Sequence, residues 1–185
     1  MKTEKVLLAF FIISLIFKLM HWPGAGPIMI LSLLFLAMCY FPFGFYFFSD
    51  KNLKTQKIGI SIVFGWLLSI CIVGILFKLM FWPGSGMMLL IGSMTAAILL
   101  VVSFMLFQNS TPELKNYHKN LLTRTLVLFV VSFVCLVLPN SVLINHYYAN
   151  EPKLKGLYLK QQENPEDETI QKEIEEYHAN RFNEN

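Results

Sequence analysis

The sequence has few charged residues, and they are unevenly distributed along the chain. Only 15% of its 185 residues are Asp, Glu, Lys or Arg, whereas soluble domains contain about 25%. Lys18 is the only charged side chain between Lys5 and Asp50, and Lys78 is the only one between Lys57 and Glu113. Because about 20 apolar residues suffice to cross a bilayer, this scarcity of charge predicts a membrane protein and argues against a soluble domain.

The sequence also lacks the residue patterns of catalytic and metal sites. Its four histidines are scattered, and it has no phosphate-binding loop, dinucleotide-binding motif or pair of catalytic carboxylates. Cys39, Cys71 and Cys135 lie in apolar segments without metal-binding spacing, and we interpret them as small apolar residues. We therefore expect no enzyme activity, no cofactor and no bound metal. We also expect no nucleic-acid partner, because lysines beside the membrane account for the positive net charge.

Five apolar segments are predicted to span the membrane. They run approximately from Val6 to Met20, Pro27 to Phe48, Ile58 to Met80, Met87 to Phe107 and Leu121 to Ile144. The predicted fold class is therefore all-α, a polytopic membrane bundle of about five helices followed by a short soluble helix. The first two pairs of segments have very short connections, so the helices of each pair must be antiparallel neighbours.

Lysine and arginine residues favour one orientation of this bundle. Eight lie on the side of the N-terminus: Lys2, Lys5, Lys51, Lys54, Lys57, Lys115, Lys119 and Arg124. Five lie on the opposite side: Lys18, Lys78, Lys153, Lys155 and Lys160. This difference predicts a cytoplasmic N-terminus and a C-terminus on the far side of the membrane.

A ten-residue motif occurs twice, at an offset of 60 residues. Phe-Lys-Leu-Met-His-Trp-Pro-Gly-Ala-Gly at 17–26 returns as Phe-Lys-Leu-Met-Phe-Trp-Pro-Gly-Ser-Gly at 77–86. The motif joins two apolar segments in each copy, which predicts a parallel repeat of one helical hairpin. We divide the chain into a first hairpin (1–50), a second hairpin (51–110), a loop with the fifth span (111–148) and an acidic soluble tail (149–185).

Each residue type of the motif has a physical role in a hairpin cap. Lysine can reach water and the free carbonyls of a helix end, and tryptophan anchors at the membrane interface. Proline stops the first helix, and glycine permits a tight turn and close backbone approach. The predicted cap residues are Lys18, Trp22, Pro23, Gly24, Gly26, Lys78, Trp82, Pro83, Gly84 and Gly86. Two interpretations stay open, a cap that only folds the hairpin and a cap that binds a partner or an anion.

The motif between two apolar helices resembles the N-terminal membrane hairpin of the GldL family, the inner-membrane motor proteins of gliding motility and type 9 secretion in Bacteroidota. The resemblance covers roughly Val6–Phe48 and Ile58–Phe107, as two tandem copies, and excludes the fifth span and the tail. It implies a location in the bacterial inner membrane, which would put the C-terminus in the periplasm.

The resemblance also indicates what this chain has lost or never had. In that family the second helix of the hairpin carries a membrane-embedded glutamate after a threonine, which takes part in proton-driven rotation. The resemblance places Ala96, after Thr95, at that position in the second copy and Leu36 in the first. No acidic residue lies inside a predicted span, and ion-driven work usually needs one. We therefore expect a relative that keeps the hairpin scaffold without the motor chemistry.

Two further segments have patterns typical of packing surfaces. Ser61, Gly65 and Ser69 are spaced by four residues in the third span, which predicts a small-residue face for packing inside the bundle or between copies. In the tail, Asn164 is a predicted N-cap for a helix from Pro165 to about Ala179. A weaker helix is predicted over Pro152–Gln162.

These patterns favour a non-enzymatic inner-membrane scaffold or accessory subunit that acts through helix–helix and hairpin-cap contacts. A small transporter or channel is one alternative, and a lipid- or anion-binding protein that uses Lys18 and Lys78 is another. The expected partners are the lipid bilayer and either a second membrane protein or further copies of this chain.

Overall fold

The computed structural model describes residues 2–22, 24–48 and 56–183, which form helices and, within these ranges, no strand. The long helices are α1 (Lys2–Leu19), α2 (Ala25–Phe48), α3 (Ile58–Leu79), α4 (Ser85–Gln108) and α5 (Lys115–Val137). The shorter helices are α6 (Asn140–Tyr147), α7 (Pro152–Glu163) and α8 (Glu168–Asn183). The predicted all-α fold class is confirmed. Pro23 of the first repeat and the loop lysines Lys51 and Lys54 lie outside the described residues.

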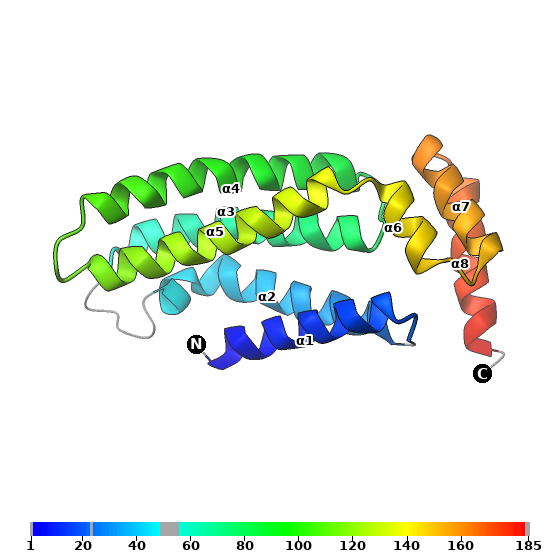
Figure 1. The fold of residues 1–185 in the computed structure, drawn as a ribbon, viewed down its shortest axis with the longest axis horizontal. Coiled ribbons are helices and arrows are strands. Elements are labelled where there is room, and N and C mark those ends of the chain that lie inside the picture. Colours follow the sequence, from blue (N-terminus) through cyan, green and yellow to red (C-terminus); the bar gives the residue numbers. More distant parts are fainter. Residues whose placement is uncertain (1, 23, 49–55, 184–185) are drawn as a thin grey trace.

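The first five helices lie side by side along the long axis of the molecule (Figure 1). Each packs on the next one in the chain, and α3 also contacts α5, so α3 occupies the middle of the bundle. The three short helices gather at one end, beside the two hairpin turns (Figure 1). The opposite end holds the N-terminus and the connection between α4 and α5, so the two ends of the bundle carry different parts of the chain.

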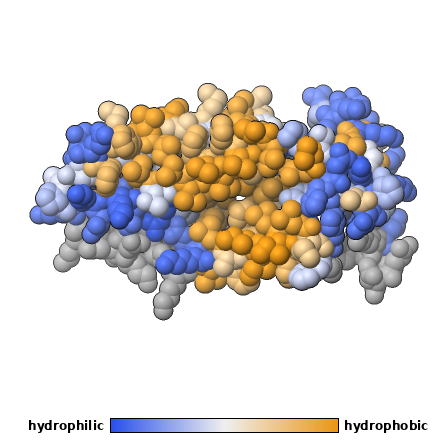
Figure 2. Space-filling view, viewed as in Figure 1, coloured by the Kyte–Doolittle hydropathy of each residue, from blue (hydrophilic) through white to orange (hydrophobic). Residues whose placement is uncertain are grey.

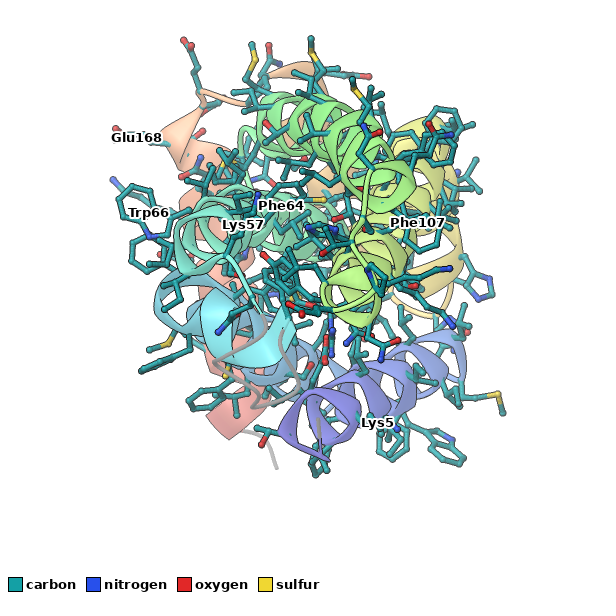
Figure 3. All side chains as sticks on the ribbon, turned by 90° about the vertical axis from the view of Figure 1, so that its left-hand side faces the viewer. Lys5, Lys57, Phe64, Trp66, Phe107 and Glu168 are labelled. Atoms are coloured by element: carbon teal, nitrogen blue, oxygen red, sulfur yellow. The ribbon has the colours of Figure 1, made fainter. Side chains whose placement is uncertain are left out.

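On the face shown in Figure 2, an apolar belt covers the middle of the bundle, and hydrophilic residues lie toward both ends. Large apolar side chains of this belt project outward, as Trp66 does on the outer side of α3 (Figure 3), where 54% of its surface is exposed. Such a belt would be an unusually large exposed apolar surface for a soluble protein. Its position between two polar ends is that of a bilayer-spanning bundle, as the sequence predicted.

Three helices, α3, α4 and α5, are long and apolar enough to cross a bilayer. A shorter apolar stretch covers Ala25–Phe41 of α2, and the helix kinks at Phe43 (φ −109°, ψ 18°), directly after Pro42, where a kink is expected. Four of the 18 residues of α1 are charged, and α1 is not among the candidate spans. The number of five spans therefore stays a prediction.

The fifth predicted span, from Leu121 to Ile144, is wrong at both ends. The helix α5 begins at Lys115 and ends at Val137, and a separate helix, α6, starts at Asn140. Leu138 is extended (φ −70°, ψ 118°), and Pro139 follows it in an extended conformation. A residue before proline is disfavoured in the helical region. The helix α5 therefore ends here, and a separate helix follows.

Close backbone approach joins the central helices. A Cβ atom added to Gly65 of α3 would lie 2.3 Å from the carbonyl oxygen of Tyr40 in α2, and one added to Gly92 of α4 would lie 2.8 Å from the Cα of Cys71 in α3. Gly65 belongs to the predicted small-residue face. Its neighbour Ser61 lies 2.7 Å from the Tyr117 hydroxyl of α5, and Ser69 donates to the Trp66 carbonyl of its own helix. All three residues are buried, and the contacts of Ser61 and Gly65 are to other helices of the same chain.

The acidic tail folds as two helices, α7 and α8, that pack on each other, and α7 also packs on α6. The helix predicted over Pro152–Gln162 is present, whereas the second helix starts at Glu168 instead of Pro165. Its first turn is capped by Asp167 and not by Asn164, because Asp167 Oδ1 accepts the backbone N–H of Thr169 at 2.9 Å and its hydroxyl at 2.6 Å. These hydrogen bonds lower the pKa of Asp167 below its ordinary value.

The close approach at Gly65 makes a prediction about stability. We expect Gly65→Ala to destabilise the bundle by about 1–3 kcal/mol, because the new Cβ would meet backbone atoms that cannot move aside. Gly59→Ala, in the same helix, is the matched control, since a Cβ there meets no atom within 4 Å. Thermal unfolding in detergent would measure both. Equal midpoints for the two variants would contradict the tight α2–α3 packing.

Candidate functional site

The two hairpin caps have the same backbone structure. In the first, the Trp22 N–H donates to the Phe17 carbonyl at 2.8 Å and the His21 N–H to the Lys18 carbonyl at 3.3 Å. In the second, Trp82 donates to Phe77 at 3.0 Å and Phe81 to Lys78 at 3.3 Å. This pair of bonds is the Schellman motif that ends many helices. The repeat in the sequence is therefore also a repeat of one helix ending.

The residue at the turning point of each Schellman motif is unusual. Glycine is the normal occupant of this left-handed position, but the chain has His21 (φ 58°) in the first cap and Phe81 (φ 57°) in the second. A side chain there costs on the order of 1–2 kcal/mol. Such strain persists only where neighbouring contacts compensate for it. His21 and Phe81 also differ from each other within a motif that is otherwise almost identical, so their side chains are the place to look for contacts.

The aromatic residues of the motif pack on each other within each cap. The rings of Phe17 and Trp22 meet edge to face with centroids 5.1 Å apart, and those of Phe77 and Trp82 do so at 4.9 Å. An apolar contact between these two positions is a regular companion of the Schellman motif. The repeated Phe and Trp are thus a structural pair, which sequence reasoning missed because it considered the tryptophan alone as an interfacial anchor.

Proline does not end the helix of the second hairpin. The helix α3 stops at Leu79, and Pro83 lies in the following turn, where the Ser85 N–H donates to the Trp82 carbonyl at 3.1 Å. Gly84 (φ 75°, ψ 4°) occupies the left-handed position of this type II turn. The corresponding Gly24 also has a positive φ of 85°. Gly86 makes no close backbone approach, because a Cβ there would meet no atom within 4 Å.

The two caps lie side by side, and the first lysine bridges them. The Lys18 ammonium donates to the carbonyl of Leu79, at the end of α3. The same ammonium lies 5.1 Å from the ring centroid of Phe81 and 4.8 Å from that of Tyr147, in cation–π geometry. Lys78 is buried, with 7% of its surface exposed, and its ammonium has no hydrogen-bond or ion-pair partner within the part of the chain that the structure describes. The two repeated lysines therefore differ in their contacts, since Lys18 joins the two caps and Lys78 is buried without such a contact among the described residues.

The helices α6 and α7 are docked on the two left-handed residues, since α6 contacts both and α7 contacts Phe81. Nε2 of His21 donates to the backbone carbonyl of His146 in α6 at 2.7 Å. Phe81 is 5% exposed and packs against Tyr147 at 6.0 Å and Tyr158 at 5.7 Å between ring centroids. Burial in this cluster raises the pKa of the Tyr158 phenol above its ordinary value. The contacts of His21 with α6 and of Phe81 with α6 and α7 are of the kind that compensates for a strained backbone.

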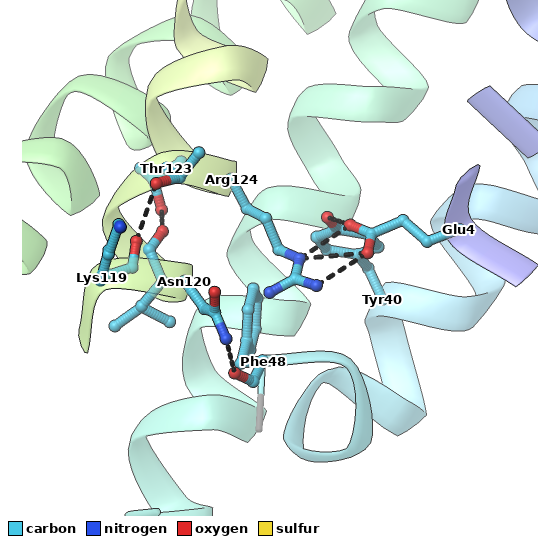
Figure 4. A network of polar contacts seen from close by, with 9 residues as sticks. Glu4, Tyr40, Phe48, Lys119, Asn120, Thr123 and Arg124 are labelled. Atoms are coloured by element: carbon cyan, nitrogen blue, oxygen red, sulfur yellow. Dashed lines mark hydrogen bonds and ion pairs between the residues drawn. The ribbon is translucent and has the colours of Figure 1, made fainter. Parts of the chain in front are cut away.

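At the opposite end of the bundle, a buried ion pair joins α1 to α5 (Figure 4). Glu4 accepts hydrogen bonds from Arg124 Nε at 2.9 Å and from its second guanidinium nitrogen, also at 2.9 Å, in a two-pronged arrangement. The Tyr40 hydroxyl of α2 donates to the same carboxylate at 2.6 Å. The side chains of Arg124 and Glu4 are only 14% and 8% exposed. A buried charge needs such pairing, because an unpaired one is costly in an apolar surrounding.

Sequence reasoning missed this network. Glu4 precedes the first predicted span at Val6 and was not considered, and Arg124 was counted only among the cations on the N-terminal side. The helix α1 begins four residues earlier than the predicted span, at Lys2, and so brings the Glu4 carboxylate against α2 and α5. By contrast, Ala96 and Leu36, where the family resemblance places the motor glutamate, are 0% and 3% exposed in the apolar core.

Comparison with known proteins supports one part of the family resemblance. A family model described as the GldL N-terminal domain matches residues 63–124, which include most of α3, all of α4 and the first part of α5. The match identifies a GldL-like membrane segment and ends at Arg124. It covers about a third of the chain and does not include the first hairpin, so the resemblance as two tandem copies is not confirmed. No curated protein and no solved structure matches the chain.

The buried ion pair predicts that loss of Arg124 will cost more stability than loss of an exposed cation. We expect Arg124→Met to destabilise the bundle by about 3–5 kcal/mol, because it leaves the Glu4 carboxylate buried without its cation. Glu4→Gln combined with Arg124→Met should recover much of that loss. Lys5→Met removes an exposed cation from the same region and serves as the control in thermal unfolding. A loss no larger than that of Lys5→Met would contradict the pairing.

The packing of the tail on Phe81 predicts that substitution of this residue will destabilise the tail locally. We expect Phe81→Ala to loosen α7 and α8 while leaving the bundle folded, because the substitution empties a core position worth about 3–5 kcal/mol. Amide hydrogen exchange should then speed up around Leu154 and Ile174, both buried residues of the tail. Phe41→Ala removes an exposed phenylalanine of α2 and is the matched control. Unchanged exchange in the tail would disprove docking through Phe81.

Proposed function

We propose that this chain, a membrane protein with a GldL-like segment over residues 63–124, is a non-enzymatic inner-membrane scaffold or accessory subunit of a gliding or type 9 secretion apparatus. The proposal rests on the identity and the burial of Ala96. It lies inside the GldL-like segment, at the position where the resemblance places the motor glutamate, and it is fully buried in the apolar core. The segment therefore keeps the helix packing of a hairpin scaffold without the ionisable group.

The buried carboxylate at the other end supports the same proposal. A residue that carries protons must pass between its charged and neutral forms, but Glu4 is held by a two-pronged contact with Arg124 and by the Tyr40 hydroxyl. These contacts favour the charged carboxylate. They also tie α1, α2 and α5 together. Glu4 is thus better suited to holding helices in place than to proton transfer.

The occupation of Lys18 argues against an anion clamp formed by the two repeated lysines. Its ammonium already has a carbonyl acceptor, Leu79, and lies against two aromatic rings. An anion would have to displace these contacts. Lys18 instead supports a scaffold role, since its ammonium joins one hairpin cap to the other and to Tyr147 of α6.

The first cap offers the surface through which we propose contact with a partner. Leu19, Met20 and Trp22 are 49%, 57% and 52% exposed at the end of α1. In the second cap, Leu79 and Phe81 are 5% exposed, because neighbouring helices and the tail cover them. The lysine distribution would place this surface at the outer face of the inner membrane, with the tail in the periplasm.

Site-directed photo-crosslinking in native membranes tests this function. We expect a photoreactive residue at Trp22 to give a discrete protein adduct, identified by mass spectrometry, because the first cap is the proposed contact surface. The matched control is the same photoreactive residue at Ile98, which is 63% exposed on the belt but distant in sequence from both caps. A membrane-protein adduct at Trp22 and not at Ile98 would support the scaffold. Adducts to lipid alone at both positions would overturn it.

A further inference from the structure

A groove between α4 and α5 lies on the outer surface of the bundle, away from both hairpin caps. It has a volume of about 480 Å³ and is lined by Leu100, Val101, Phe104, Leu122 and Leu126. All five are apolar, and Val101, Phe104 and Leu126 are 61%, 50% and 46% exposed. The volume lies within the range of about 300–1,000 Å³ that is typical of small-ligand sites. The groove therefore suits a slender apolar group that enters from the bilayer.

Two lysines continue the groove toward the polar end of the bundle. Lys115 and Lys119 precede Leu122 and Leu126 in α5 at spacings of four, three and four residues, which places all four on one face of the helix. Both lysines are exposed. With a rise of about 1.5 Å per residue, Lys119 lies roughly 4.5 Å beyond Leu122 along the helix axis. Cationic groups thus stand at one end of an apolar groove.

The start of α5 adds a second feature that favours an anion at this place. The helix begins at Lys115, and its N-cap residue, Leu114, supplies no side-chain cap. The first N–H groups of a helix lack internal partners, and the helix dipole makes this end electropositive. Glu113 is the acidic side chain of this loop; it is exposed and precedes the helix by two residues. Lys115, Lys119 and the open helix end together outweigh its single negative charge.

We propose that this groove binds an anionic phospholipid from the leaflet on the lysine-rich side, with an acyl chain along α4 and α5 and the phosphate beside Lys115, Lys119 and the start of α5. The pairing of an apolar groove with cations at headgroup level is the complement of such a lipid. The groove is too short for a transmembrane helix of a partner. Its lining spans five residues in each helix, or about 6 Å of helix axis, whereas a helix is about 10 Å wide and would need a far longer face.

Native mass spectrometry of the full-length protein from mild detergent tests the proposal, with phosphatidylglycerol as the probe and phosphatidylcholine of the same acyl chains as the comparison. We expect a one-to-one adduct with phosphatidylglycerol that survives at lipid concentrations where phosphatidylcholine is lost. Lys115→Gln with Lys119→Gln should weaken this adduct about tenfold or more, because each lysine near an anionic headgroup contributes about one kcal/mol. Leu126→Trp, which fills the groove, should weaken it with both lysines in place.

Two control measurements make the outcome decisive. Lys160→Gln with Lys172→Gln removes two exposed lysines from the tail and should leave the adduct unchanged. Circular dichroism of each variant establishes that it is folded, and the groove-filling variant separates loss of charge from loss of the acyl site. Equal retention of the two lipids, equal weakening by the tail variant, or a protein crosslinked to a photoreactive residue at Val101 would each overturn the proposal. The crosslink would assign the groove to a partner protein instead.

Discussion

The left-handed residue at the end of α1 and α3 is the constraint on which the rest of the molecule depends. His21 and Phe81 lie in connections of five residues, 20–24 and 80–84, so each hairpin pairs antiparallel helices with a short turn. The same conformation turns their side chains toward α6 and α7. A glycine would reverse the chain at lower conformational cost, but it would provide no side chain for the tail. The position that ends the helices is therefore also the position that attaches the tail.

The two ends of the bundle are closed by different chemistry. At the cap end, the Lys18 ammonium lies over the rings of Phe81 and Tyr147, and Phe81 belongs to an apolar cluster with α6, α7 and α8. At the other end, Glu4 and Arg124 satisfy each other's buried charge, with Tyr40 as a further donor. Each cluster joins segments more than 60 residues apart in the chain. Between them, glycine contacts such as Gly65 with Tyr40 hold the apolar helices at short distance.

The proposed scaffold and the proposed lipid site use different polar groups, the first inside the bundle and the second on its surface. Glu4 is paired with Arg124, and Lys18 donates to the carbonyl of Leu79. These two contacts favour a fixed arrangement of helices over one that changes with ion binding. Lys115 and Lys119, in contrast, lie outside the core beside an apolar groove. A bound anionic lipid would hold α4 against α5, the two helices that carry much of the GldL-like segment. Its role would be to support the same rigid bundle from outside.

The sequence by itself determined the features that depend on local composition and periodicity. The apolar runs located α3 and α4 to within two residues, the kink of α2 followed from Pro42, and the repeated motif identified the two hairpin turns. Tertiary structure decided what depends on groups distant in the chain. The motif singled out Lys18, but no local pattern shows that its ammonium meets the carbonyl of Leu79 in the other hairpin. The pairing of Glu4 with Arg124 and the docking of the tail on Phe81 also leave no local pattern, because only helix packing brings the partners together. The end of α5 depends on both local sequence and tertiary structure. Pro139 was visible in the sequence and accounts locally for the extended Leu138, but the packing of α6 on α7 appears only in the tertiary structure.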